Sequence, residues 1–397
     1  MNTSINKTTA DQKNTDMAII SVLSAKRIKQ AKASYNVRNI DLNCATQLLH
    51  GKLQPQIGDV VLARIKAIGQ HQRIELSTGR RAGLHIGDEI IVCYGNRYAP
   101  DQFESYIPDS LEPCHLVAGG GIASKSVNQH SKMKTATSIE PIGLLADRTG
   151  KRINIENWAL PLSTVEQKRP YTVAVIGTAM NAGKTTTAAG IVRTLSQQGY
   201  KVGAAKVTGT GSGGDRWKMV DAGANRVLDF TDAGIPTTFG IPFQQLETVF
   251  DILVNQLIID ESEIIVLEVA DGVYQRETAE LIASDFFLEK VDSIIFAAPD
   301  SFGAAVGVDI LRKQGHSVLA VSGLINASPL AIREAQVILD LPILSPEKVG
   351  DELISILTEN TDSDSLNIPL IAAASHLYNP VVFKQVPHRE AVNCQPS

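Results

Sequence analysis

The chain has 397 residues, longer than one ordinary domain, which predicts two domains or one large domain with a substantial attachment. Hydrophobic residues make up 44% and charged residues 20% of the sequence, and this balance excludes general disorder. The lack of any apolar run of about 18 residues argues against a membrane-spanning helix, and a net charge of -5 without an extended basic stripe argues against a nucleic-acid partner.

Four widely scattered cysteines lack the paired spacing of a zinc site or of a compact disulfide framework. We therefore interpret them as reduced thiols of a cytoplasmic protein that serve packing and not nucleophilic attack. They are Cys44, Cys93, Cys114 and Cys394.

Residues 1–50 are expected to form a flexible N-terminus and an amphipathic helix. The first stretch, to about residue 16, is polar and typical of a disordered segment. Between Met17 and Ile40 the chain carries lysines and arginines but no acid, which is similar to a transit peptide. The apolar residues recur at roughly helical spacing, so a helix packed on the body of the protein is favoured. They are Ile19, Ile20, Leu23, Ile28 and Ala31.

Residues 51–160 are expected to form a small β-rich domain, either a barrel or a sandwich. Short β-branched runs at 60–65, 73–76 and 89–94 are separated by turns. An apolar run at 115–123 is broken by three glycines, where backbones could approach closely. A loop is expected at residues 124–139, and another strand is expected at residues 141–147. The segment 95–104 is either a structural corner or a ligand contact, because it concentrates Asn96, Arg97, Tyr98, Asp101 and Gln102.

A phosphate-binding loop lies near the start of a second domain, expected over residues 170–358. The run 173–176 predicts a strand, residues 177–187 read Gly-Thr-Ala-Met-Asn-Ala-Gly-Lys-Thr-Thr-Thr, and a helix follows to about Gln198. Glycines let the backbone approach phosphate oxygens, and a helix N-terminus favours negative charge. Lys184 would reach the terminal phosphates, and Thr185, with Thr186 beside it, would supply a hydroxyl to Mg²⁺.

The spacing of this loop carries a resemblance to one family. A Gly-Thr pair, four further residues and then Gly-Lys-Thr resembles the loop of dethiobiotin synthetase and related ATP-dependent ligases of the SIMIBI type. The resemblance implies ATP and Mg²⁺ as cofactors. Asn326 resembles the adenine-contacting asparagine of that superfamily, with a simple turn residue as the alternative. The implied loop contacts to nucleotide are Gly177, Thr178, Asn181, Ala182, Gly183, Lys184, Thr185 and Thr186.

The strand expected at 202–207 contains Lys206 and leads into a glycine-rich polar loop. In the same family a lysine on the second strand precedes a substrate loop, so the resemblance assigns Lys206 to an anionic substrate or phosphate. It assigns Thr208, Thr210 and Ser212 to the substrate loop, and the alternative is a flexible loop with solvated side chains. Asp215 is either a Mg²⁺ ligand or a turn cap.

A buried-strand pattern at 264–272 delivers carboxylates from its C-terminal end to the edge where parallel sheets bind ligands. Glu268 or Asp271 is therefore expected to hold Mg²⁺. The ligase relatives carry a glutamate at the end of this strand, which favours Glu268. Gln275 is assigned to substrate, and Arg276 could hold a substrate carboxylate or compensate charge on a transferring phosphate.

Further strands are expected at 293–298, 317–322 and 341–346. The C-terminal extension at 359–397 carries no motif, and His376 and His388 are too isolated to be ligands. Together the elements predict an α/β fold, in which a P-loop NTPase-type, mostly parallel sheet flanked by helices follows a small β-rich domain.

Three functions remain open. The first is an ATP- and Mg²⁺-dependent enzyme that activates a small carboxylate or carbamate by phosphoryl transfer and joins it to an amine, with Lys184, Lys206 and Arg276 as catalytic residues. The motif order also resembles the P-loop domain of D-glutamate N-acetyltransferase-like proteins, so the second is acyl transfer with coenzyme phosphates on the loop. The third is a nucleotide-dependent switch or metallocentre-assembly protein. We expect a small-molecule substrate, no nucleic-acid or membrane partner, and a homodimer.

Overall fold

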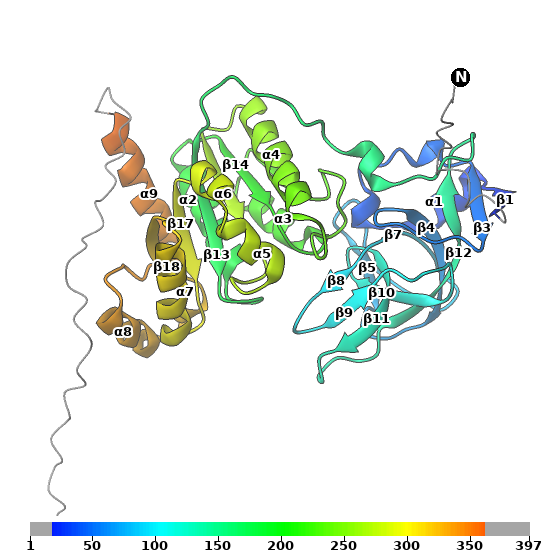
Figure 1. Cartoon of the computed structure of the whole chain (residues 1–397), viewed down its shortest axis with the longest axis horizontal. Coiled ribbons are helices and arrows are strands. Elements are labelled where there is room, and N and C mark those ends of the chain that lie inside the picture. The colour runs from blue at the N-terminus through cyan, green and yellow to red at the C-terminus, as the bar shows by residue number, and fades with distance from the viewer. Residues whose placement is uncertain (1–17, 362–397) are drawn as a thin grey trace, which may run out of the picture. The chain divides into compact units, whose positions relative to one another are not determined.

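The computed structural model describes residues 18–361, and it contains two sheets of different construction (Figure 1). Both sheets belong to one compact unit that reaches to Leu353, and a second unit begins at Ile354. The expected disordered N-terminus, most of the C-terminal extension, His376, His388 and Cys394 lie outside the described residues.

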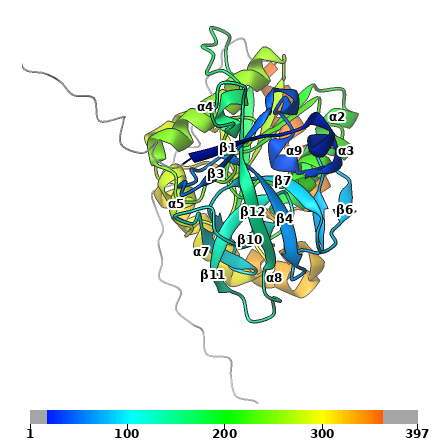
Figure 2. The ribbon, with the colours of Figure 1, turned by 90° about the vertical axis from the view of Figure 1, so that its right-hand side faces the viewer.

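The first sheet contains a closed β-barrel. β12 pairs with β4, β4 with β7, β7 with β11, β11 with β10, and β10 again with β12, so these pairings complete a ring. Figure 2 shows β12, β4 and β7 side by side. The ring strands are β4 (Val60–Ala67), β7 (Glu89–Tyr94), β10 (Cys114–Ala118), β11 (Ile122–Gln129) and β12 (Thr137–Ala146). Beside them lie β1 (Ala18–Val22), β2 (Lys32–Ala33), β3 (Gln47–Gly51), β8 (Arg97–Tyr98) and β9 (Phe103–Tyr106), with β5 (Arg73–Glu75) and β6 (Arg81–Gly83) forming a separate hairpin.

Alternating apolar residues give the ring strands two buried faces. On β4, Val61, Ala63 and Ile65 belong to one hydrophobic cluster, while Val60 and Leu62 belong to another. Successive side chains of a strand point to opposite faces, so a run of β-branched residues can serve both clusters. The sequence left a barrel and a sandwich open, and the closed ring of strand pairings is a barrel.

The N-terminal part of this sheet differs from the expected amphipathic helix. The β-branched residues of Ala18–Val22 form β1, which pairs antiparallel with β3, and only Ala25–Gln30 is helical (α1). The Ser24 side chain accepts a hydrogen bond from the backbone N–H of Arg27, a capping contact that starts the helix there. A short apolar segment fits both periodicities, and pairing with β3 decides for the strand. The loop expected at 124–139 is also wrong, because most of it belongs to β11 and β12.

The second sheet is fully parallel in the described part of the chain, in the order β15-β14-β16-β13-β17-β18. Its strands are β13 (Tyr171–Gly177), β14 (Val202–Lys206), β15 (Arg226–Asp229), β16 (Ile264–Glu268), β17 (Ser293–Ala297) and β18 (Val318–Ser322). Residues 341–346 contribute only a bridge between Ile343 and Val321 and no strand. Figure 1 shows helices flanking this sheet. They are α2 (Lys184–Gln197), α3 (Gly213–Asp221), α4 (Phe243–Ile259), α5 (Arg276–Ile282), α6 (Asp285–Lys290), α7 (Ser301–Lys313), α8 (Pro329–Ile338) and α9 (Pro346–Thr361).

Buried polar contacts join the two sheets. Tyr35 donates a hydrogen bond to Asp229 at the end of β15, and the Arg38 guanidinium lies 2.7 Å from Oδ1 of Asp232. On β5, Glu75 accepts hydrogen bonds from the Trp217 indole at 3.0 Å and from the Gly213 backbone at 2.9 Å, at the start of α3. These pairs satisfy charges that would otherwise be buried alone, and they hold the barrel side against α3.

Candidate functional site

The phosphate loop lies between β13 and α2, as the sequence predicts. Gly183 has φ of 100°, a left-handed conformation in which a Cβ would also lie 2.8 Å from Cα of Gly323. Asn181 is a non-glycine residue with positive φ, 61°, at the tip of the loop. The Lys184 ammonium group donates to the backbone carbonyls of Ala179 and Asp271. The lysine is therefore folded over the loop, and its hydrogen-bond partners within residues 18–361 are carbonyl oxygens.

A hydroxyl and two carboxylates meet beside this lysine. The Thr185 hydroxyl oxygen lies 2.8 Å from Oε1 of Glu268 and 3.0 Å from Oδ1 of Asp215. The other oxygen of Glu268 is buried and has no hydrogen-bond partner among the described residues. Lys206 forms an ion pair with Asp215. Parallel pairing of β14 with β16 places Lys206 directly opposite Glu268, so the strand ends bring these groups together.

The charged groups in this cluster shift one another's pKa values. Burial and the neighbouring Asp215 raise the pKa of Glu268 to about 7. Burial alone would raise the pKa of Asp215, but Lys206 outweighs it and holds that pKa below its usual value. Burial also opposes the charge of Lys206, yet Asp215 and Glu268 raise its pKa. Burial lowers the pKa of Lys184. Glu268 is therefore the carboxylate whose ionised form lacks adequate partners.

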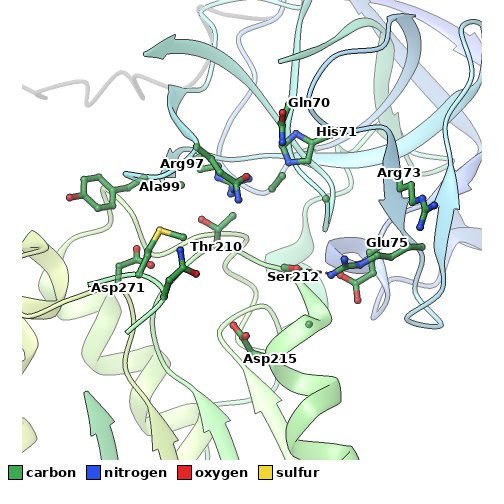
Figure 3. Close-up of a pocket in the computed structure, with 18 of the residues that line it drawn as sticks. Gln70, His71, Arg73, Glu75, Arg97, Ala99, Thr210, Ser212, Asp215 and Asp271 are labelled. Carbon is green, nitrogen blue, oxygen red and sulfur yellow. Dashed lines mark hydrogen bonds between the residues drawn. The ribbon is translucent and has the colours of Figure 1, made fainter. Parts of the chain in front are cut away.

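A polar cavity of about 870 Å³ opens between the barrel side and the ligand edge of the parallel sheet (Figure 3). Asp271 and Asp215 lie on its parallel-sheet side, and Arg97 and His71 lie on the barrel side. Burial raises the pKa of Asp271, whose carboxylate faces this cavity while its carbonyl accepts from Lys184. The cavity residues predicted from the sequence as site residues are Asn181, Lys206, Thr210, Ser212, Asp215 and Asp271.

Three of the residues predicted to act on the substrate are not among the cavity-lining residues. Thr208 is fully buried and its hydroxyl donates to the carbonyl of Ala270. Gln275 caps α5 by accepting a hydrogen bond from the Thr278 backbone at 2.9 Å. Arg276 extends outward at the start of α5, because the side chain is 69% exposed and pairs with an acid one turn along the helix. The structure thus places these three residues in structural or surface positions.

Within residues 18–361, Asn326, Thr178 and Thr186 also make no contact that points to a ligand. The Asn326 amide donates to the carbonyls of Gly323 and Leu344, which is the turn alternative. Thr186 is exposed and Thr178 is half-buried.

The segment 95–104, for which the sequence left a structural corner and a ligand contact open, lies on the cavity. Arg97, Tyr98, Ala99 and Gln102 line it. Asp101 in the same turn accepts a hydrogen bond from the Asn181 amide of the phosphate loop at 2.9 Å. The signal was the concentration of directional side chains in 95–104, but their pairing with residues far along the chain could not be read from the sequence.

The glycines at 119–121 do mark a close approach, as expected. A Cβ on Gly120 would overlap the carbonyl oxygen of Gly211 in the loop before α3. Bringing the β10–β11 turn this close places Ala118 and Gly119 on the cavity opposite Ser212 and Gly214.

Metal, membrane and thiol features were searched over residues 18–361. Within that range no group of three or more histidines, cysteines and acids is arranged to hold a metal ion. None of the helices there is both long and apolar enough to cross a bilayer. Cys93 and Cys114 are buried and Cys44 is half-buried, all as free thiols.

The parallel sheet, with a phosphate loop between its central strand and α2, has the fold of the P-loop NTPases. No family model matches the chain, and neither does any curated protein. Among solved structures, the signal recognition particle receptor FtsY of Elizabethkingia anophelis is 16% identical over 49% of this chain and 67% of its own, with a TM-score of 0.30. The 54 kDa signal recognition particle protein of Aeropyrum pernix K1 is 16% identical over 52% of this chain and 51% of its own, with a TM-score of 0.33.

Chloroplast FtsY of Physcomitrella patens is 11% identical over 47% of this chain and 61% of its own, with a TM-score of 0.31. The chain thus spans between about half and two thirds of these proteins. Likeness at this level concerns the fold alone, and the fold assignment rests on the strand order and phosphate loop described above.

Proposed function

We propose that the protein is an ATP- and Mg²⁺-dependent enzyme that activates a small carboxylate or carbamate by phosphoryl transfer and joins it to an amine. The observation that carries this proposal is the meeting of Thr185, Asp215 and Glu268 beside Lys184, at the edge of a polar cavity. Phosphoryl transfer needs a cation, a lysine and a positioned acceptor more than it needs covalent help from the protein.

The residues present fit a magnesium ion. Magnesium in nucleotide sites takes one or two carboxylates together with phosphate and water oxygens. The unpartnered oxygen of Glu268 is a buried hard ligand of this kind, with the Thr185 hydroxyl next to it. When bound, the ion would neutralise charge on the phosphates and polarise the transferring group. Asp271 is the weaker candidate, because its carboxylate faces the cavity and not Thr185.

The remaining groups have distinct roles in this proposal. Lys184 would exchange its two carbonyl partners for terminal phosphate oxygens, a charge-assisted contact that favours it. Lys206 stays protonated because acids surround it, so it supplies fixed positive charge where the transferring phosphate would meet the substrate. Thr210 and Ser212 would donate to the substrate from the cavity wall.

Acyl transfer is the second candidate, and one observation favours it. The Asp271 carboxylate faces the cavity with its pKa raised by burial, which suits a base that takes a proton from an amine. Coenzyme phosphates would then lie on the loop, and Mg²⁺ would not be required.

Thermal unfolding with ligands separates the candidates. A ligand that binds the native state raises the unfolding midpoint by mass action. At a hundredfold excess over Kd it adds about 2.7 kcal/mol to the free energy of unfolding. We expect a Mg²⁺-dependent increase with ATP, a smaller one with GTP, and none with acetyl-coenzyme A. An increase with the coenzyme alone would replace the ligase proposal by acyl transfer.

Lys184→Ala should abolish the ATP-dependent increase, measured relative to the variant's own unliganded midpoint, because the buried lysine that would reach the phosphates is gone. Lys201→Ala is the matched control, since Lys201 is exposed and pairs with Glu261. An unchanged response to ATP in Lys184→Ala would refute the proposal.

A further inference from the structure

Arg97, at the start of β8, is a buried charge with neutral partners. Its side chain is buried, and its guanidinium donates to the carbonyl of Val117 and, at 2.9 Å, to Oε1 of Gln102. None of the ion pairs found in residues 18–361 involves Arg97. Burial lowers its pKa to about 10, although the carboxylates of Asp101 and Asp271 oppose this shift. A buried charge without an ion pair is costly, and a bound anion would relieve that cost.

The guanidinium also keeps donors for a ligand. Only two of the five N–H donors of Arg97 are engaged, and Nε has no partner. Figure 3 shows the side chain pointing from the barrel side into the cavity, toward Thr210. The planar fork of an arginine matches the two oxygens of a carboxylate or phosphate.

Neutral side chains stand beside Arg97 on this wall, and the other charged residues of the barrel side that line the cavity are Arg73, Glu75 and Arg81. The ring of His71 lines the cavity, and burial together with the charge of Arg97 lowers its pKa to about 4, so the imidazole is neutral. Its Nδ1 is buried and unpartnered. Gln70 and Gln102 complete the wall as neutral amides. Arg97 is thus a buried cation of this wall. The buried Glu75 is already engaged by Trp217 and Gly213, and Arg73 and Arg81 are exposed.

The position of Arg97 relates this wall to the phosphate loop. Four residues further along the turn, Asp101 accepts the hydrogen bond from Asn181 of that loop. An anion held by Arg97 would therefore lie across the cavity from Asp271 and Lys206, at the edge where phosphoryl transfer is proposed.

We infer that Arg97 binds an oxyanion group of the small-molecule substrate and thereby selects anionic substrates. The inference rests on the proposed function in one respect, namely that the substrate occupies this cavity. The same chemistry could come from a substrate carboxylate or from a nucleotide phosphate, and the experiment below separates these two sources.

The test measures binding of succinate, inorganic phosphate and Mg²⁺–ATP by calorimetry to the full chain and its variants. Loss of a charge-assisted pair should weaken succinate binding to Arg97→Gln about tenfold to a hundredfold, with Mg²⁺–ATP affinity unchanged. Arg73→Gln removes the same charge from the exposed rim and should change succinate affinity less than about threefold. Weaker Mg²⁺–ATP binding to Arg97→Gln with unchanged succinate binding would assign Arg97 to the nucleotide and overturn the substrate assignment.

Two further results would also overturn the inference. One is that the wild type and Arg97→Gln bind succinate equally and bind inorganic phosphate equally. The other is that the wild type binds neither succinate nor inorganic phosphate. Arg97→Lys keeps the charge without the fork, so it should weaken succinate binding even if Arg97→Gln fails to fold. The proposed function fails separately. Arg97-dependent succinate binding without any Mg²⁺–ATP binding by the wild type would refute the nucleotide proposal and leave this inference standing.

Discussion

Glu268→Gln should remove a specific part of the pH dependence of unfolding. The pKa of Glu268 is raised from 4.5 to about 7 in the folded protein by burial and by Asp215. Because the folded protein holds this proton more tightly than the unfolded chain, its contribution to the free energy of unfolding is present at low pH and is lost as pH rises through about 7. Integrated from about pH 5 to about pH 8, the loss amounts to about 2–3 kcal/mol.

The assay is urea unfolding of wild type and Glu268→Gln, without ligand, at both pH values. The difference between the two proteins isolates Glu268, because the pKa of Asp215 is lowered and that group titrates below this range in both. We expect the variant to gain about 2–3 kcal/mol relative to the wild type between the two pH values, whatever constant offset the amide introduces. A parallel pH dependence of the two proteins would refute the assignment of a buried, poorly satisfied carboxylate.

The same variant connects stability with function. A protonated or amide side chain cannot supply an anionic oxygen to a cation, so the Mg²⁺-dependent ATP response should be lost in Glu268→Gln. In the wild type that response should weaken as pH falls below about 7. Thermal midpoints with ATP, measured with and without Mg²⁺, give both results. Full retention of the magnesium effect in the variant would move the metal site away from this strand.

Two other substitutions test the placement of residues outside the cluster. Tyr35→Phe removes the hydroxyl that donates to Asp229, a buried contact between the two sheets, and should lower the free energy of unfolding by about 1–3 kcal/mol; an unchanged urea midpoint would contradict this. Arg276→Ala should alter neither the ATP response nor the free energy of unfolding by more than about 0.5 kcal/mol, because the side chain is exposed; loss of turnover in this variant would show that the arginine reaches the substrate.

The phosphate loop and its carboxylate strand could be predicted from the sequence for a local and a topological reason. Gly183 and Lys184 sit between a β-branched strand and a helix, so their conformation is determined mainly by neighbours in the chain. Glu268 could be placed near Thr185 because the carboxyl ends of adjacent parallel strands lie at one edge. Neither inference needed knowledge of distant side chains.

Side-chain direction could not be predicted in the same way. Arg276 follows the carboxylate strand closely in sequence, yet the start of α5 turns it to the surface. Thr208 belongs to a plausible substrate loop, but its hydroxyl satisfies the carbonyl of Ala270. The sequence left the segment of Arg97 open between a corner and a ligand contact, and the Arg97 guanidinium contacts the carbonyl of Val117, twenty residues further along the chain. Such choices depend on packing between segments that spacing alone does not relate.

The walls of the cavity come from two separate stretches of chain, residues 70–119 and residues 180–271. The second stretch contains the lysine, hydroxyl and carboxylates of the phosphate edge, while the first contributes three arginines, one glutamate and neutral amides. Substitutions at Arg97 or Gln102 can therefore alter the shape and charge that a substrate meets without removing a contact to the phosphate loop. A substitution at Asp101 would also remove the partner of Asn181, so this one position links the choice of substrate to the loop that would bind the nucleotide.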